Sequence, residues 1–375
     1  MMAQDRQQLL ANVSSVVVKI GTQALCDAAG RLDTGIIEGI AADIASLQRE
    51  RGIKVALVSS GAIGAGVAKM NLPRRPRDLP MLQATAAVGQ SLLMNLFAAA
   101  FGPHNLHAGQ ILVTREDFEN RLRYLNLRNC IHALQACNAV PIINENDAVS
   151  VDEVRFGDND LIAAHVTNLI RADLLVLLSV VDGLLDERGM VRDVVNEMDA
   201  QVMQLVRPEK SARGSGGMSG KLIAAGTVKT AGEPVIIANG KSPGILRRVL
   251  AGEPVGTLIV PPAKRLSSRS RWIGLTARER GSIVVDGGCV AALRDNKSLL
   301  ASGIIRVGGD FEPGDPVVIV DEAGQTVARG LSNYSREDVE KIKGHKSRDF
   351  AALLASENYY DEVVHRDDLV IYAGP

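Results

Sequence analysis

The stretch SVVVKI, residues 15–20, is followed directly by Gly21 and Thr22 and decides how this chain folds. Its valines and isoleucine are β-branched residues that favour strands, and an apolar run of this kind is typical of a strand buried on both faces. Lys19 interrupts the run near its carboxyl end. Since ligands of open α/β sheets bind beyond the carboxyl ends of the strands, this lysine is a candidate functional residue.

Similar apolar runs recur along the chain, and helical patterns separate them. Strands are expected at residues 15–20, 55–58, 107–113, 139–143, 174–178 and 234–240, the last of these being the last core strand. Between them, Thr34 is expected to cap a helix that Gly52 ends, and a long apolar helix is expected over residues 81–101. The alternation of strand and helix predicts an α/β sandwich with a mainly parallel sheet.

The length, composition and cysteine pattern indicate the number of domains, the charge and the compartment of the protein. A chain of 375 residues suits a large and a small domain, and the low aromatic fraction of 3% leaves the core to aliphatic side chains. A net charge of −1 gives no general attraction to nucleic acid or to an anionic membrane. The four scattered cysteines form no CxxC pair, the N-terminus lacks a signal-peptide pattern, and no run approaches the length that spans a bilayer. We therefore expect a cytoplasmic protein with reduced thiols and no membrane partner.

The composition changes near residue 260, where a segment rich in Pro, Ser and Arg begins. We expect one domain over residues 1–262, a linker over 263–280 and a small β-rich domain over 281–375. Strands of the small domain are expected at residues 282–286, 303–307, 316–320 and 326–331. Residues 281–360 contain nine Lys or Arg and twelve Asp or Glu, a balance that disfavours binding to an RNA phosphate backbone.

Residues 214–221, GSGGMSGK, form a second candidate site. Glycine lets the backbone approach a ligand closely, and successive N–H groups can converge on an anion. Residues 222–228 have helical spacing, so the segment leads into a helix N-terminus, which also favours an anion. It is not a Walker A loop, because Ser215 and Leu222 stand where that motif has Gly and Ser or Thr. The alternatives are a phosphate-binding loop with Lys221 beside it and a flexible linker.

Lys19 and Lys221 both adjoin glycine turns, which suggests a shared chemical role. Phosphoryl transfer is mainly a problem of charge, because the oxygens of the moving group must be neutralised, and two lysines at its two ends would do this. Asp160 is a candidate for holding both ammonium groups in place. Alternatively, Asp158 and Asp160 bind magnesium, because two carboxylates two residues apart suit a hard cation. No hydrolase pattern accompanies these residues, and His165, inside an apolar helix, is interpreted as structural.

Five motifs, taken in order, resemble those of the glutamate kinases in the amino acid kinase family. They lie at residues 16–22, 59–66, 141–147, 156–160 and 214–221. The C-terminal part resembles a PUA domain, so the resemblance covers nearly the whole chain. It implies an amino acid kinase-like αβα sandwich followed by a small β-rich PUA-like domain. The implied activity is ATP-dependent phosphorylation of the L-glutamate side-chain carboxylate, giving L-glutamyl 5-phosphate as the first step of proline synthesis.

The resemblance also implies roles for individual residues. Lys19 and Lys221 would stabilise the transferring phosphoryl group and Asp160 would orient them, so these three are the candidate catalytic residues. The implied substrate-binding residues are Ser60, Asn144, Asp147 and Asn159, with Asp147 as the counter-charge of the α-ammonium group. The implied ATP-binding residues are Lys19, Gly21, Ser179, Val180, Ser215, Gly216, Gly217, Met218, Ser219, Gly220 and Lys221. A carboxylate acceptor is ionised at neutral pH, so the absence of a candidate general base is expected.

Three residues depart from the pattern of the family. Val180 stands where an acidic residue is common, Gly220 replaces a threonine, and Gln23 replaces a small serine, which affects nucleotide affinity more than reaction type. The resemblance further implies ATP and Mg²⁺, proline as a feedback inhibitor, a homo-oligomer and a downstream glutamyl phosphate reductase. It assigns no protein ligand to the metal. The alternatives are a family member that acts on aspartate, N-acetylglutamate or UMP, and an RNA-binding protein that acts through the PUA-like tail.

Overall fold

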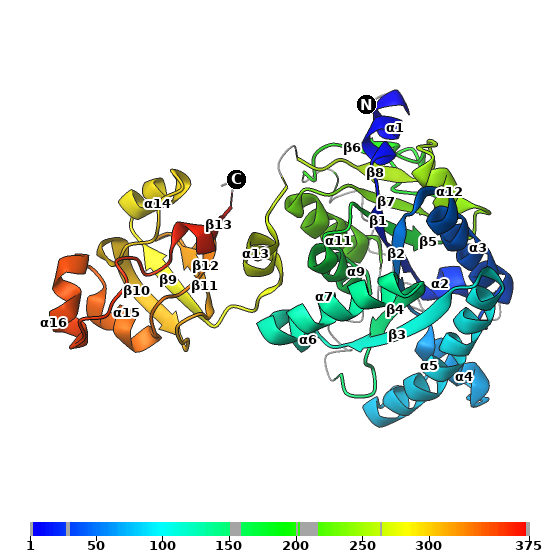
Figure 1. Ribbon diagram of the computed structural model, residues 1–375, viewed down its shortest axis with the longest axis horizontal. Helices are drawn as coiled ribbons and strands as arrows, with labels where there is room; N and C mark the ends of the chain where they lie inside the picture. Colours follow the sequence, from blue (N-terminus) through cyan, green and yellow to red (C-terminus); the bar gives the residue numbers. More distant parts are fainter. Residues whose placement is uncertain are drawn as a thin grey trace. The chain divides into compact units, whose positions relative to one another are not determined.

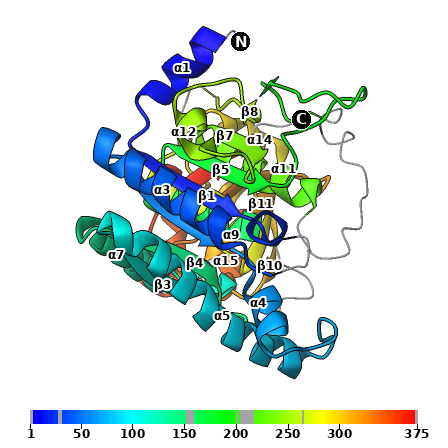
Figure 2. The same ribbon diagram turned by 90° about the vertical axis from the view of Figure 1, so that its right-hand side faces the viewer.

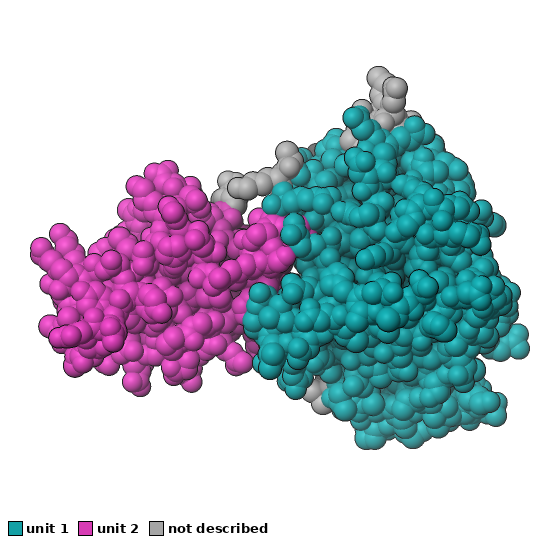
Figure 3. Space-filling model, viewed as in Figure 1, with its two compact units in different colours: residues 1–265 teal, residues 266–375 magenta. Residues whose placement is uncertain are grey.

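The computed structural model describes residues 3–27, 31–150, 159–199, 202, 217–262 and 265–372. The chain divides into two compact units, Met1–Arg265 (unit 1) and Leu266–Pro375 (unit 2), which Figure 3 shows in different colours. The boundary falls inside the segment in which the composition changes.

Unit 1 is built on an eight-stranded sheet. Its strands are β1 (Ser15–Ile20), β2 (Lys54–Ser59), β3 (His107–Val113), β4 (Ala139–Glu145), β5 (Leu174–Ser179), β6 (Val194–Val195), β7 (Val235–Asn239) and β8 (Thr257–Ile259). They follow the order β3-β4-β2-β1-β5-β7-β8-β6, and every neighbouring pair is parallel except β7 and β8. All six predicted strands are present. The prediction that residues 234–240 form the last core strand is wrong, because β8 follows, and β6 and β8 are too short to show a period in the sequence.

Helices cover both faces of this sheet (Figures 1 and 2). They are α1 (Ala3–Ala11), α2 (Thr22–Leu25), α3 (Thr34–Arg51), α4 (Ala62–Lys69), α5 (Leu79–Phe101), α6 (Arg115–Glu119), α7 (Arg121–Ala136), α9 (Asn159–Ile170), α11 (Met218–Ala231), α12 (Ile245–Leu250) and the 3-10 turn η1 (Gly102–His104). Helices α3, α5 and α12 lie on one face of the sheet, and α7, α9 and α11 lie on the other. The predicted αβα sandwich is therefore confirmed.

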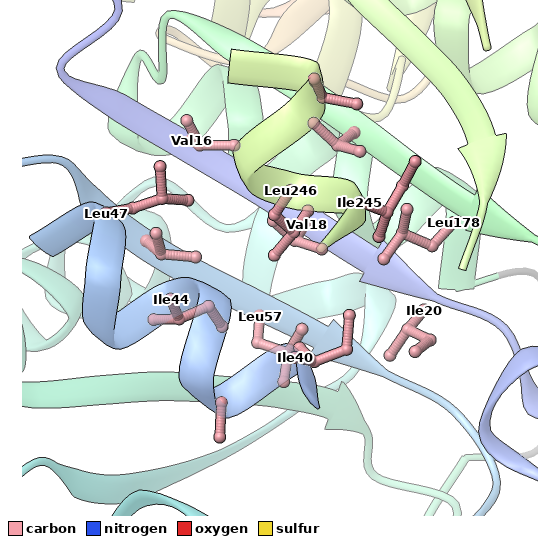
Figure 4. Close-up of a cluster of buried hydrophobic side chains, with 14 of the residues drawn as sticks. Val16, Val18, Ile20, Ile40, Ile44, Leu47, Leu57, Leu178, Ile245 and Leu246 are labelled. Atoms are coloured by element: carbon pink, nitrogen blue, oxygen red, sulfur yellow. The ribbon is translucent and has the colours of Figure 1, made fainter. Parts of the chain in front are cut away.

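The side chains of β1 alternate between the two faces. Val16, Val18 and Ile20 pack in the cluster of Figure 4 with side chains of α3 and α12. Successive side chains of a strand point to opposite faces of the sheet, so Lys19 faces the layer that contains α9 and α11. The alternation that fills the core thus also directs the lysine towards the helices that carry Asp160 and Lys221.

Helix α3 begins differently from the sequence expectation. Its N-cap is Asp33 and not Thr34, because the Asp33 carboxylate accepts hydrogen bonds from the N–H groups of Gly35 and Ile36. The helix ends at Gly52 as expected, with a left-handed φ of 64° that glycine adopts without strain.

Helix α5 corrects another expectation. Residues Leu79–His104 are long and apolar enough to cross a membrane, so the prediction that no run approaches this length is wrong. Polar residues such as Thr85 and Gln90 interrupt the run, so the sequence shows no continuous apolar stretch of this length. In unit 1 the helix packs against α3, α4 and β3, and Leu93 and Phe97 are fully buried in the core. This packing is that of a core helix in a globular domain.

Unit 2 has a five-stranded sheet of its own, ordered β10-β9-β11-β12-β13. Its strands are β9 (Gly281–Val285), β10 (Ile304–Gly309), β11 (Pro316–Val320), β12 (Thr326–Leu331) and β13 (Leu369–Ile371). Its helical segments are α13 (Ser268–Arg271), the π-helix η2 (Trp272–Thr276), α14 (Gly287–Arg294), α15 (Arg336–Ile342), α16 (Phe350–Leu354) and the 3-10 turns η3 (Ala301–Gly303), η4 (Ser347–Asp349) and η5 (Arg366–Asp368). The four predicted strands are present, and the short β13 was not predicted.

Residues 266–280 differ from the expected linker. They contain α13 and η2 and belong to unit 2, where the side chains of Arg271 and Trp272 are buried. A linker leaves its side chains in solvent, whereas these large side chains are part of a packed domain. The Pro, Ser and Arg content that suggested a linker here begins a helical segment, capped by the Ser267 hydroxyl, which accepts from the Ser270 N–H.

Candidate active site

The carboxyl ends of four adjacent parallel strands meet at one edge of the unit 1 sheet. Strands β4, β2, β1 and β5 are neighbours in that order, and they end near Asn144, Ser59, Lys19 and Ser179. The first turns of α9 and α11 come to the same edge, because Asp160 and Lys221 contact residues of the strand ends or of each other. Most of the residues expected at the site are therefore brought together by the sheet and by two helix starts.

A carboxylate links the two candidate lysines. Lys19 Nζ lies 2.7 Å from Asp160 Oδ1, and Lys221 Nζ lies 2.8 Å from Asp160 Oδ2. The side chains of Lys19 and Lys221 are only 5% and 6% exposed, and that of Asp160 is fully buried. We call these three residues the lysine–aspartate cluster. Two ammonium groups and one carboxylate leave it a net charge of +1, which favours a polyanionic ligand.

The polar residues expected to bind the acceptor form a second group. Asn159 Nδ2 donates to Ser59 O at 2.9 Å, to Ser60 Oγ at 2.8 Å and to Asn144 Oδ1 at 3.1 Å. Asn144 Nδ2 donates in turn to Gln90 Oε1 at 2.9 Å, and Asn144 and Gln90 are 2% and 8% exposed. We call Gln90, Asn144, Asn159 and Ser60 the amide array. Since Asn159 and Asp160 are consecutive in α9, the array adjoins the lysine–aspartate cluster.

Gln90 was not among the residues singled out from the sequence. It lies in α5 within a buried stripe that includes Ala86, Leu93 and Phe97 at helical spacing. A polar residue in such a stripe needs a buried hydrogen-bond partner, and this is the one sequence signal that marks the position. The partner, Asn144, is far away in the sequence, so it is visible only in the fold.

Two glycines allow α4 and α5 to cross at close range next to the array. A Cβ atom on Gly66 would lie 1.9 Å from Thr85 O, and one on Gly89 would lie 1.8 Å from Ala62 O. Both distances are too short for any side chain, since the obstructing atoms belong to the backbone. Helix α4 starts directly after Ser60 and Gly61, so this contact ties the β2 turn to α5.

The remaining residue expected to bind the acceptor, Asp147, lies on the turn after β4. It is partly exposed and three residues beyond Asn144. The same turn is closed by the N–H groups of Val149 and Ser150, which both donate to Asn146 O. The structure thus places Asp147 at the same strand end as Asn144.

The structure describes only part of the expected nucleotide site. Ser215 and Gly216 lie outside the described residues, as does Asp158. Gly217 is the N-cap of α11, and Met218, Ser219, Gly220 and Lys221 form its first turn, where the helix dipole favours an anion. Ser179 ends β5 with its carbonyl accepting from the Gly240 N–H at 2.8 Å, and the side chain of Val180 is 38% exposed.

Gly21 has a hydrogen bond that the sequence does not predict. Its N–H donates to Leu178 O at 3.2 Å and so extends the pairing of β1 with β5. That N–H group is therefore engaged within the protein in this structure. A Cβ atom on this residue would lie 3.6 Å from Lys19 Nζ, which is an ordinary contact.

Two further observations concern titratable groups. Burial, and secondarily the positive charge of Arg115, lower the pKa of His165 in α9 to about 4, so this ring is neutral at pH 7. It packs on Phe118 with ring centroids 5.3 Å apart, which agrees with a structural role.

Among the described residues, no group of three His, Cys, Asp or Glu side chains is arranged to hold a metal ion. Both oxygens of Asp160 already contact lysines, so this carboxylate does not fit a magnesium ligand.

Comparison with known families agrees with this fold. The model of the amino acid kinase family matches residues 14–239, and that of the PUA domain matches residues 281–354. The chain therefore belongs to the amino acid kinase family, and its C-terminal part is a PUA domain.

Individual relatives show to which group of amino acid kinases the chain is similar. The glutamate 5-kinase of Caldanaerobacter subterraneus subsp. tengcongensis is 43% identical over 363 residues, which are 95% of this chain and 97% of the relative. The glutamate 5-kinase of Myxococcus xanthus is 45% identical over 373 residues, with 96% and 97% covered. A solved UMP kinase from Bacillus anthracis is 17% identical, with a TM-score of 0.45 over 67% of this chain and 97% of that one. Within the amino acid kinases, the two curated relatives place the chain among the glutamate 5-kinases.

Proposed function

We propose that this chain transfers the γ-phosphoryl group of MgATP to the side-chain carboxylate of L-glutamate, forming L-glutamyl 5-phosphate and ADP. One observation carries the proposal: two buried ammonium groups lie 2.7 and 2.8 Å from a shared carboxylate at the carboxyl edge of a parallel sheet. The similarity to relatives named glutamate 5-kinase supports the choice of acceptor.

The lysine–aspartate cluster suits phosphoryl transfer for electrostatic reasons. During transfer, negative charge is spread over the three equatorial oxygens of the moving group, and fixed cations stabilise that charge. In our proposal Lys19 and Lys221 contact these oxygens, and Asp160 holds both ammonium groups in position. Magnesium enters with ATP as part of the substrate, since Asp160 has no free oxygen to offer it.

The acceptor needs no protein base. One oxygen of the ionised glutamate side chain attacks the γ-phosphorus, a new P–O bond forms, and the bond from that phosphorus to the bridging oxygen of ADP breaks. In our proposal Ser60, Asn144 and Asn159 hold the acceptor carboxylate in line, and Asp147 binds the α-ammonium group. The product is an acyl phosphate, which water hydrolyses readily, so a reductase that consumes it is the expected partner.

The other proposed contacts concern the nucleotide and regulation. Ser179, Val180 and the segment 215–221 bind ATP, with N–H groups at the start of α11 on its phosphates. As the first enzyme of proline synthesis in the cytoplasm, the protein would be a homo-oligomer inhibited by proline. The PUA domain contributes to regulation or stability and does not bind RNA, in agreement with the excess of acidic residues over residues 281–360.

The test uses hydroxylamine, which converts an acyl phosphate into a stable hydroxamate. Purified protein is incubated with MgATP, hydroxylamine and either glutamate, aspartate or N-acetylglutamate, and a sample without ATP serves as the control. We expect hydroxamate with glutamate only. Hydroxamate with another acceptor in place of glutamate would assign a different substrate, and no product with any of them would refute the proposal.

A further inference from the structure

We propose that Gln90 is a positioning residue for the acceptor carboxylate, which it orients through the amide of Asn144. The inference rests on the proposed function, because it concerns the same site. It adds a residue from α5, an element that contributes none of the expected site residues.

The hydrogen bonds of Asn144 give its side chain a single orientation. Asn144 Oδ1 accepts from the Glu145 N–H at 2.9 Å and from Asn159 Nδ2 at 3.1 Å. Asn144 Nδ2 donates to Gln90 Oε1 at 2.9 Å. Rotation of the amide by 180° would place its NH₂ group against two donors and its oxygen against the oxygen of Gln90. Gln90 therefore supplies the acceptor that completes the orientation.

The Gln90 side chain is connected to the site through its hydrogen bond with Asn144. Among the described residues, Gln90 Nε2 has no hydrogen-bond partner, so the only hydrogen bond of this side chain is the one to Asn144. Without Gln90, the Asn144 NH₂ group would be a buried donor that lacks an acceptor, and the amide would move to find one. Asn159 would then lose one of its acceptors, and its contact with Ser60 would be less well defined.

The backbone around Gln90 is placed with little freedom. The preceding residue, Gly89, packs its Cα so closely on Ala62 that no Cβ fits. Ala62 begins α4, two residues after Ser60. Helix α5 therefore holds Gln90 at a defined distance from the β2 turn, and the side chain reaches from there to β4. A residue held in this way can set the position of an amide to within the small tolerance that catalysis requires.

The experiment compares two substitutions in α5. Gln90→Met removes the acceptor with little change in volume, and Gln90→Leu is a second variant that also lacks it. Thr85→Val is the matched control, because Thr85 is fully buried in the same helix and its hydroxyl donates to Met81 O at 2.6 Å, a carbonyl of α5 itself. Glutamate KM, ATP KM, kcat and Tm are measured for each variant.

We expect Gln90→Met to raise the glutamate KM about five- to tenfold, the effect of one neutral hydrogen bond, with ATP KM within about twofold of the original value. Thr85→Val should lower Tm about as much as Gln90→Met does, and it should leave both the glutamate KM and the ATP KM unchanged. A double-mutant cycle separates positioning from a direct contact: in an Asn144→Ala background, Gln90→Met should change glutamate KM by less than about twofold.

Two results would overturn the inference. One is an unchanged glutamate KM in both folded Gln90 variants, and the other is a full, multiplicative effect of Gln90→Met in the Asn144→Ala background. Failure of the proposed function looks different, because the unsubstituted protein would then form no glutamyl hydroxamate at all.

Discussion

Replacement of Asp160 by asparagine removes the one negative charge of the lysine–aspartate cluster while preserving the shape of the side chain. At an effective dielectric constant of about 20, each contact of about 2.8 Å between unit charges is worth about 6 kcal/mol before desolvation is counted. Relaxation and desolvation reduce the measured cost of breaking a buried ion pair to about 3–5 kcal/mol. We expect Asp160→Asn to lower the free energy of unfolding by this amount.

The same substitution separates nucleotide binding from catalysis. The net charge of the cluster rises from +1 to +2, so ATP binding should persist, and ATP should raise the Tm of the variant at least as much as that of the unsubstituted protein. The two ammonium groups would no longer be held in place, and kcat should fall by about 10²-fold or more, as it does when a preorganised charge contact is lost. Urea unfolding with and without ATP, together with the hydroxamate assay, measures both quantities.

Asp43→Asn is the matched control for this prediction. Asp43 is also a buried carboxylate of unit 1, but it lies in α3, where it contacts Arg247 Nε at 2.8 Å and accepts from the Leu246 N–H. Its loss should lower the free energy of unfolding by about 1–3 kcal/mol and leave kcat unchanged. If Asp160→Asn behaves like this control, with normal kcat, the charge argument for the cluster is refuted.

Three other predictions concern single residues. Lys19→Ala and Lys221→Ala should each lower kcat by about 10²-fold with little change in glutamate KM. Lys229→Ala, in the last turn of α11, is the control and should leave kcat unchanged. A near-normal kcat in either of the first two variants would remove that lysine from the mechanism. Asp147→Ala should mainly raise the glutamate KM, and an unchanged value would move the ammonium contact elsewhere. The pKa of His165 is about 4 in the folded protein and 6.5 in the unfolded chain, so the unfolded chain binds a proton first as the pH falls. The contribution of the neutral His165 ring to stability is therefore complete above pH 6.5, and the free energy of unfolding falls by up to about 3 kcal/mol towards pH 4. His165→Gln should abolish this part of the pH dependence in urea melts.

Features that follow from local sequence were predicted well. The β-branched run of β1 and the apolar run of β5 are strands because their side chains can be buried on both faces, and this is visible in the sequence itself. Lys19 stood out because it breaks such a run at the end where ligands bind. Charge complementarity then suggested Asp160 as its partner, and Lys19 Nζ lies 2.7 Å from Asp160 Oδ1.

Features that depend on tertiary contacts were missed. Gln90 has its partner on a different strand, and no pattern within α5 reveals where its side chain is directed. The hydrogen bond of the Gly21 N–H to Leu178 O depends on the alignment of β1 with β5, which no local pattern shows. The choice of Asp33 over Thr34 as the cap of α3 is a competition between adjacent residues that only backbone geometry decides.

The close crossing of α4 and α5 also limits how this protein can evolve or be redesigned. Alanine is the most conservative replacement for glycine, yet at positions 66 and 89 it would push a methyl group into the backbone of the opposite helix. Alanine is therefore excluded at these two positions, whereas the neighbouring position 88 accommodates a valine side chain, with 40% of the residue's surface exposed. A library made to change the acceptor should keep both glycines and diversify the polar side chains that the helix pair carries, because the spacing of the helices is the part of the site that tolerates no adjustment.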